Sequence, residues 1–214
     1  MNKKMLIIIS ILLIAVIGGV LTFSFINKGT NENVKEDNKT TESEKLSSDE
    51  KLNEKVDSNK MLVLYFSQSG NTETIANFIK DYTNADILEL ETVKEYPSVL
   101  EELYKVGQEE LDSNARPELK TKVDISKYDV IFIGYPIWGA NLPMAWYSFF
   151  DEYDLSGKTL VPFTTHGGSG MSGTDGDIKR EEPNAKVLKG YEARGSEAKE
   201  KQSEVNDWLK QIGF

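Results

Sequence analysis

The sequence predicts a three-layer α/β fold for residues 61–214. From residue 61 onward, short apolar runs alternate with segments of helical periodicity, a pattern typical of a parallel sheet with helices on both faces. The runs are apolar at almost every position rather than at alternate ones, as in strands that are buried on both faces. Together with right-handed crossovers, these observations predict a five-stranded parallel sheet of order 2-1-3-4-5.

The first half of this domain is expected to hold two strands and two helices. Residues 61–66 (MLVLYF) form a continuous apolar run and predict the first strand, and residues 73–81 predict an amphipathic helix. Residues 86–90 (DILEL) predict the second strand. A second helix is expected at 96–111, because Leu100, Leu103 and Tyr104 follow at helical spacing.

The second half repeats this alternation. Residues 129–134 (DVIFIG) predict a central third strand, and a helix at 143–150 has Pro143 in its first turn. Residues 158–164 (KTLVPFT) predict the fourth strand, in which Pro162 cannot donate a ladder hydrogen bond. We then expect a short helix at 175–182 and a short fifth strand at 185–188. A final helix is expected at 196–212, with Trp208 and Leu209 facing inward.

The chain begins with an apolar segment that predicts a membrane anchor. Residues 5–26 contain no charged side chain and would be about 33 Å long as a helix, enough to cross a bilayer core of about 30 Å. Lys3 and Lys4 make residues 1–4 a basic n-region, which favours a cytoplasmic N-terminus and an extracytoplasmic domain. A signal peptide, either uncleaved or cleaved near Gly18 and Gly19, is the alternative.

The amino-acid composition predicts a linker and excludes several classes of partner and functional site. Residues 27–60 are almost entirely polar and charged, so we expect a disordered linker. The formal net charge of −10 argues against nucleic acid as a partner. The absence of cysteine excludes disulfides, thiolate catalysis and iron–sulfur clusters, and the single histidine excludes a multi-histidine metal site. We predict neither a metal site nor catalytic side chains.

A turn of small residues lies between the first strand and the first helix. Its sequence is Ser67-Gln68-Ser69-Gly70-Asn71-Thr72, and it offers hydroxyls and free amide groups at a helix N-terminus. Such a turn suits a phosphate, although many turns of this composition serve only as helix caps. The turn contains no lysine or arginine, so it lacks the P-loop pattern, and it suits one terminal monophosphate better than a triphosphate.

The motif SQSGNT resembles the phosphate loop of the flavodoxins, in which such a turn holds the phosphate of FMN. The resemblance extends over 61–214 and includes two further loops in the family's order. It implies a flavodoxin-like fold and FMN as the cofactor. The expected FMN-binding residues in the first loop are the six members of the turn: Ser67, Gln68, Ser69, Gly70, Asn71 and Thr72.

The second loop follows the third strand. It resembles the flavodoxin loop that covers one face of the flavin ring, with Trp138 as the stacking aromatic side chain; a core tryptophan is the alternative. In parallel sheets, ligands bind beyond the carboxyl ends of the strands at the point where strand order reverses, here between the first and third strands. The expected FMN contacts in this loop are Pro136, Ile137, Trp138, Gly139 and Ala140.

The third loop follows the fourth strand, and its glycines allow close backbone approach to a ligand. It differs from the best-known flavodoxins, which carry a tyrosine on the outer flavin face, and it leaves that face open or covered by Met171 or His166. His166 either stacks on the flavin, donates to a flavin oxygen or satisfies a backbone carbonyl. The expected FMN contacts are Thr165, His166, Gly167, Gly168 and Ser169.

The resemblance implies an electron-transfer flavoprotein, which the apolar segment at 5–26 would tether to a membrane. Its partners would be a redox protein or a small electron acceptor, and an acidic surface would steer it to basic partners. The alternative function is an FMN-dependent NAD(P)H:quinone-type oxidoreductase, which an open flavin face favours and the lack of a recognisable nicotinamide-binding segment disfavours. A binding module that has lost the flavin is a third alternative, against which the intact SQSGNT motif and Trp138 argue.

Overall fold

The computed structural model describes residues 60–214. Its parallel sheet has the order β2-β1-β3-β4-β5, with β6 also paired to β4, so the predicted order 2-1-3-4-5 is confirmed. The strands are β1 (Met61–Tyr65), β2 (Asp86–Glu89), β3 (Val130–Pro136), β4 (Thr159–His166), β5 (Lys186–Val187) and β6 (Tyr191–Arg194).

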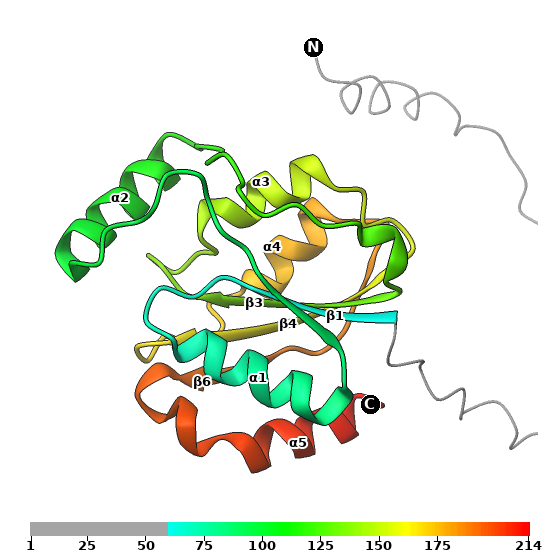
Figure 1. Ribbon diagram of the computed structural model, residues 1–214. Helices are drawn as coiled ribbons and strands as arrows, with labels where there is room; N and C mark the ends of the chain where they lie inside the picture. Colours follow the sequence, from blue (N-terminus) through cyan, green and yellow to red (C-terminus); the bar gives the residue numbers. More distant parts are fainter. Residues whose placement is uncertain (1–59) are drawn as a thin grey trace, which may run out of the picture. The chain divides into compact units, whose positions relative to one another are not determined.

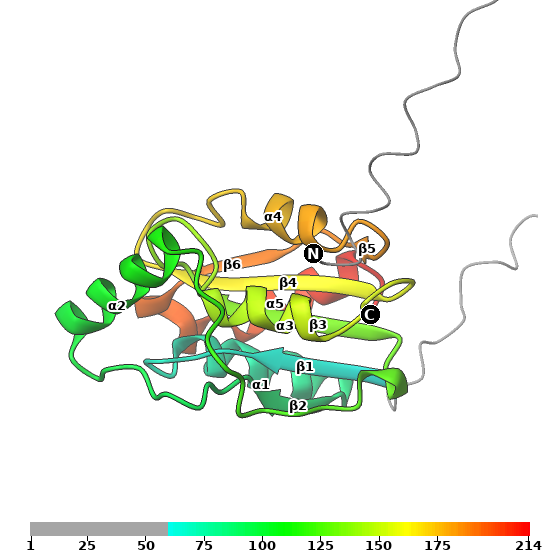
Figure 2. The same cartoon turned by 90° about the horizontal axis from the view of Figure 1, so that it is seen from above.

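Helices cover both faces of the sheet (Figures 1 and 2). Helices α1 and α5 lie on one face, whereas α3 and α4 lie on the other. The helices are α1 (Asn71–Thr83), α2 (Leu100–Asp112), α3 (Met144–Glu152), α4 (Thr174–Glu181) and α5 (Gln202–Gln211), with two 3₁₀ turns, η3 (Ile125–Lys127) and η4 (Gly195–Glu200).

The strands supply two separate cores because successive side chains point to opposite faces. Leu62 and Leu64 of β1 join the core under α3, whereas Val63 joins the core under α1 and α5. All three side chains are at most 1 % exposed. Burial on both faces accounts for the uninterrupted apolar runs in the sequence.

The fifth position of the sheet is filled by two short strands rather than one. Strand β5 pairs with Thr159–Leu160 and β6 with Phe163–His166, so the ladder to this edge is interrupted at Pro162. Proline has no N–H to donate, and the chain loops out between the two short strands. The expectation of one strand at 185–188 was therefore incomplete, since β6 follows it.

Two expected helices begin later in the structure. The final helix expected at 196–212 is a 3₁₀ turn followed by α5, which starts only at Gln202. Helix α2 starts at Leu100 rather than at residue 96, because Tyr96 packs instead against Phe66 and Trp138. Pro143, expected in the first turn of α3, precedes the helix as its N-cap residue.

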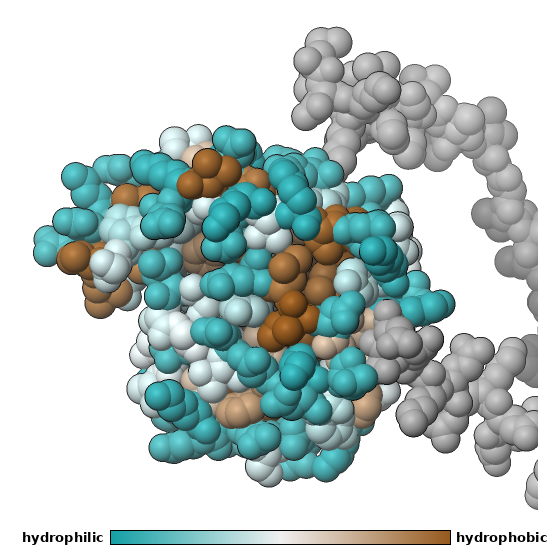
Figure 3. All heavy atoms as spheres, viewed as in Figure 1, coloured by the Kyte–Doolittle hydropathy of each residue, from teal (hydrophilic) through white to brown (hydrophobic). Residues whose placement is uncertain are grey.

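Helix α2 belongs to an excursion that projects from the body of the domain (Figure 1). An isolated antiparallel bridge between Thr92 and Leu119 closes the base of this excursion. Three apolar side chains at its start, Val99, Leu100 and Tyr104, are more than half exposed, and Figure 3 shows apolar surface at the outer end of α2.

Within the described residues, no helix has the length and apolarity that a membrane span requires. The anchor expected at 5–26 and all but the last residue of the linker expected at 27–60 lie outside those residues.

Candidate functional site

Three loops meet beyond the carboxyl ends of β1, β3 and β4, as expected for a parallel sheet. Thr165 of β4 connects them. Its Oγ1 lies 2.8 Å from Oγ1 of Thr72 at the start of α1, and its carbonyl oxygen accepts from the Ile137 amide at 2.9 Å. Thr72 and Thr165 are 1 % and 4 % exposed. The three predicted loops therefore form one continuous site.

The turn before α1 has the features of an anion cradle. Gly70 takes a left-handed φ of 78°, and no side chain in the described part of the chain caps the helix, so no cap there competes for the first amides of α1 as donors. The Ser67 hydroxyl oxygen is buried and has no hydrogen-bond partner among the described residues. A buried hydroxyl without a partner is costly unless a ligand satisfies it.

The other polar side chains of this turn have partners within the chain. Asn71 donates to Ser69 Oγ at 3.1 Å, and Gln68 makes a long contact of 3.4 Å with the Pro97 carbonyl oxygen. Ser69 and Gln68 remain exposed. The turn itself contains no cation, as the sequence indicates.

The surroundings of β1 are electronegative. Burial, followed by the charges of Glu89 and Glu73, raises the pKa of Tyr65 to about 12. Burial also raises the pKa of Glu89, and the neighbouring carboxylates of Glu73 and Glu91 add to this effect. Additional negative charge near the end of β1 is therefore disfavoured, except at the helix N-terminus, whose dipole attracts it.

Trp138 lies in a tight turn after β3. Trp138 and Asn141 exchange two backbone hydrogen bonds of 3.0 and 2.9 Å, and the two residues between them, Gly139 and Ala140, both have left-handed φ angles of 54° and 66°. This is the backbone of a hairpin turn that normally favours glycine or asparagine. A left-handed alanine stores strain of a kind that is concentrated at functional sites.

The Trp138 indole is half-buried among aromatic side chains. It makes edge-to-face contacts with Phe66 and Tyr96 at centroid distances of 5.3 and 5.2 Å. Gly107 of α2 lies so close that a Cβ there would be 3.3 Å from the indole. Trp138 thus lies between the turn after β1 and the α2 excursion.

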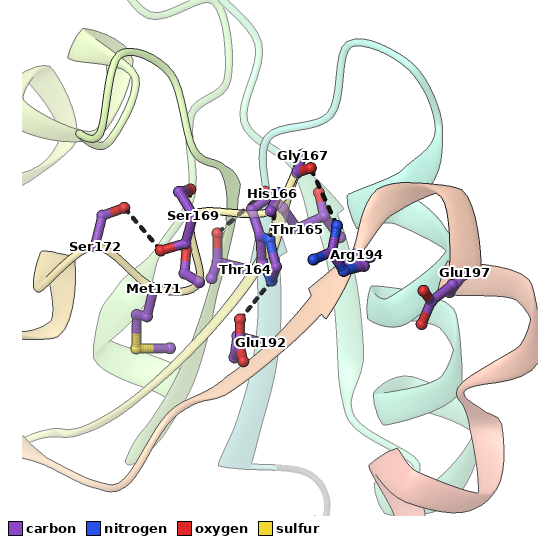
Figure 4. Close-up of polar contacts among 12 residues, drawn as sticks. Thr164, Thr165, His166, Gly167, Ser169, Met171, Ser172, Glu192, Arg194 and Glu197 are labelled. Atoms are coloured by element: carbon purple, nitrogen blue, oxygen red, sulfur yellow. Dashed lines mark hydrogen bonds and ion pairs between the residues drawn. The ribbon is translucent and has the colours of Figure 1, made fainter.

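Side chains of the edge strand β6 contact the loop that follows β4 and its first residue (Figure 4). The ring Nδ1 of His166 accepts from the Gly168 amide at 2.9 Å, and Nε2 makes an ion-pair contact with Oε2 of Glu192. The Arg194 guanidinium makes a longer contact of 3.4 Å with the Gly167 carbonyl oxygen. Nδ1 of His166 is therefore used as an acceptor, whereas Nε2 contacts Glu192 but has no hydrogen-bond partner among the described residues.

Glu192 and Arg194 contact the loop after β4, and neither is among the residues predicted from the sequence. Both lie on β6, which was not predicted. The alternation in Tyr191-Glu-Ala-Arg194, with Ala193 buried and its neighbours exposed, was the available signal for a short edge strand. Together with Lys201 and two further glutamates they line an open hollow of about 430 Å³ beside His166.

Comparisons with known proteins agree with this arrangement. The family model described as Flavodoxin matches residues 60–212. A candidate flavoprotein from Bacteroides eggerthii shares 29 % identity and a TM-score of 0.61 over 72 % of this chain and 98 % of its own. The corresponding protein from Bacteroides uniformis shares 28 % identity and a TM-score of 0.62 over 72 % and 99 %.

A third solved structure is a Lactobacillus acidophilus flavoprotein in complex with FMN. It is 21 % identical, with a TM-score of 0.56 over 68 % of this chain and 99 % of its own, and at this identity the likeness concerns the fold alone. No curated protein matches the chain.

Proposed function

This chain belongs to the flavodoxin family, and we propose that it binds FMN and acts as an electron carrier at a membrane. FMN supplies the redox chemistry when it is bound, by accepting and releasing one or two electrons. The protein's part is to hold the phosphate, orient the ring and limit access to it. The Lactobacillus flavoprotein was crystallised with FMN, and the residues of this chain fit the same group.

The buried Ser67 hydroxyl carries the proposal. It is an unsatisfied polar atom at the uncapped N-terminus of α1, where free amides and the helix dipole favour one phosphate. Ser67, Ser69 and the first amides of α1 would hold the phosphate. Trp138, the loop at 137–140 and the glycine loop at 167–169 would border the ring.

Replacing Ser67 by alanine tests the phosphate assignment. In the apoprotein the change removes an unsatisfied buried atom, so the free energy of unfolding should stay the same or rise. FMN affinity should fall about tenfold, because a hydrogen bond to a charged acceptor is lost. Affinity for riboflavin, which lacks the phosphate, should be unchanged.

The measurement is fluorescence titration of the full chain with each flavin. Ser148→Ala is the matched control, since Ser148 is also buried but lies in α3, outside the three loops. Equal losses for FMN and riboflavin in Ser67→Ala would contradict the phosphate assignment, and a wild-type chain that binds neither flavin would contradict the function.

Measuring the rate of quinone reduction distinguishes an electron carrier from the oxidoreductase alternative. The FMN-loaded full chain is mixed with NADH or NADPH and a quinone. A carrier should reduce the quinone no faster than the mixture without protein, whereas catalysis at tens of turnovers per second would support the oxidoreductase. The negative net charge supports a basic protein partner, so electron exchange with such a partner should slow as salt is raised.

The membrane tether rests on the uncharged segment at 5–26 and the polar segment that follows it. We expect the full chain to sediment with membranes, and we expect protease added outside intact cells to degrade the flavodoxin domain. Release of the chain by high salt alone, or protection from external protease, would contradict the tether or its orientation.

A further inference from the structure

His166 lies at the end of β4 with its side chain only 6 % exposed. Figure 4 shows the ring between the loop that follows it and strand β6. On one side, the Gly168 amide donates to Nδ1 at 2.9 Å. On the other side, Nε2 contacts the Glu192 carboxylate. Three residues from two strands and a loop are thereby connected through one imidazole.

This arrangement determines where the proton of His166 lies. A ring nitrogen that accepts an amide N–H carries no proton, so Nδ1 is bare. In the neutral ring the proton is then on Nε2, which lies against the Glu192 carboxylate, and the negative charge favours a proton at this nitrogen. Glu192 thus selects the tautomer that allows His166 to hold Gly168.

Strand β6 also contacts the loop at two other points. Arg194 reaches the carbonyl oxygen of Gly167, and a Cβ at Gly170 would lie 3.4 Å from Glu192 Oε2. Gly168 and Gly170 have positive φ angles of 144° and 66°, which glycine adopts readily. The loop conformation therefore depends on contacts from β6, with His166 as the connection to an amide in the middle of the loop.

We propose that His166 is a positioning residue for the loop at 167–170: in its neutral form it fixes the Gly168 amide for flavin binding, and protonation of Nδ1 releases that amide. This proposal rests on the proposed FMN binding. Because His166 acts through Gly168 and not on the phosphate, its loss should weaken FMN and riboflavin equally.

Protonation of His166 would occur in a mixed electrostatic environment. The Glu192 carboxylate faces the ring directly, and the hollow beside it is also lined by Arg194, Glu197, Lys201 and Glu204. Lys201 is already paired with Glu197 and Glu204 at 3.2 and 2.9 Å. Glu192 and Arg194 therefore remain as the charges that contact the imidazole and its loop.

The tautomer is tested first in the wild-type apoprotein, without any flavin. His166 is the only histidine in the chain, so its ring resonances are assigned without ambiguity. We expect ¹⁵N NMR at neutral pH to show a bare Nδ1 and a protonated Nε2, together with a hydrogen-bond coupling between Nδ1 and the Gly168 amide. A protonated Nδ1 in the neutral ring would overturn the proposal.

The positioning role is tested by flavin titration of variants of the full chain. His166→Asn keeps an acceptor close to the position of Nδ1 and should retain wild-type affinity within about threefold, without the pH dependence. His166→Leu should bind FMN and riboflavin about tenfold more weakly, since an amide hydrogen bond is lost. Glu197→Gln is the control, because Glu197 lines the same hollow without contacting His166.

Wild-type affinity for both flavins should fall as the NMR signals of His166 titrate to the protonated form. Affinity that stays constant through that titration, or no rescue by His166→Asn, would overturn the positioning role. A wild-type chain that binds neither flavin would instead contradict the proposed function, and the NMR experiment would still decide the tautomer.

Discussion

The hydrogen bond between Thr72 and Thr165 offers a quantitative test of how the site is assembled. Their hydroxyl oxygens lie 2.8 Å apart in a buried environment and join the start of α1 to the end of β4. Replacing Thr72 by valine keeps the shape of the side chain and removes only the hydroxyl. The Thr165 hydroxyl is then left buried and loses this partner.

The expected cost follows from that loss. An average buried hydrogen bond contributes about 1 kcal/mol, and a polar group left buried without a partner costs about 1–3 kcal/mol. We therefore expect Thr72→Val and Thr165→Val each to lower the free energy of unfolding by about 1–3 kcal/mol. The double variant has no orphaned hydroxyl and should lie within about 1 kcal/mol of the wild type.

The assay is urea unfolding of the full chain without flavin, monitored by tryptophan fluorescence. The two single losses sum to about 2–6 kcal/mol and the double variant stays within about 1 kcal/mol of the wild type, so the double-mutant cycle should give a coupling energy of at least about 1 kcal/mol. As a control, Thr83 lies at the other end of α1, where its hydroxyl donates to Ile79 at 2.7 Å. Thr72→Val and Thr83→Val share no partner and should be additive. An additive Thr72–Thr165 cycle would refute the inference that this bond joins the loops.

Three further changes have defined outcomes. Gly134→Ala places a Cβ against the Phe163 ring, well inside van der Waals contact, and this overpacking should lower the free energy of unfolding in urea by about 1–3 kcal/mol. Burial raises the pKa of Glu110 although Tyr96 donates to it, so its contribution to stability is greatest at acid pH and is lost as pH rises through the raised pKa. Glu110→Gln should accordingly raise the Tm at neutral pH and leave it unchanged at acid pH. Ala140→Gly relieves a left-handed φ and should stabilise the protein by up to about 1 kcal/mol in thermal unfolding.

The Gly134 and Glu110 changes each have a matched comparison. Gly167→Ala should keep wild-type stability, because a Cβ there has no atom within 4 Å. Glu95→Gln, an exposed loop carboxylate, should not alter the dependence of Tm on pH. A Gly134→Ala protein as stable as the wild type, or a pH profile unaffected by Glu110→Gln, would contradict the packing and burial described here. Lower stability of Ala140→Gly would show that the turn is not strained.

The sequence was sufficient for most of the architecture because the relevant signals are local. Continuous apolar runs such as 61–66 and 129–134 specify strands that are buried on both faces, and right-handed crossovers then leave few strand orders. The turn at 67–72 was recognisable for the same reason, since hydroxyls, a glycine and a helix start are adjacent in the chain. The sequence could not show, however, that the Ser67 hydroxyl is buried without a hydrogen-bond partner among the described residues.

The sheet edge shows why other features escaped prediction. Strand β6 is four residues long and exposed at alternate positions, so it carries little apolar signal. It pairs with β4 after Pro162, whereas β5 pairs before it, so two short strands lie where one was expected. The contact between His166 and Glu192 also depends on this edge, because the two residues are far apart in the sequence and only β6 places Glu192 beside the ring.

The sequence alone determined the layered fold, the strand order and the three loops that form the candidate site, since periodicity and turn chemistry act over neighbouring residues. Only the tertiary structure decided which polar groups contact one another: Thr72 with Thr165, Tyr96 with Glu110, and His166 with Glu192. Such pairs join residues that are distant in sequence, and their formation depends on distances that no local pattern encodes.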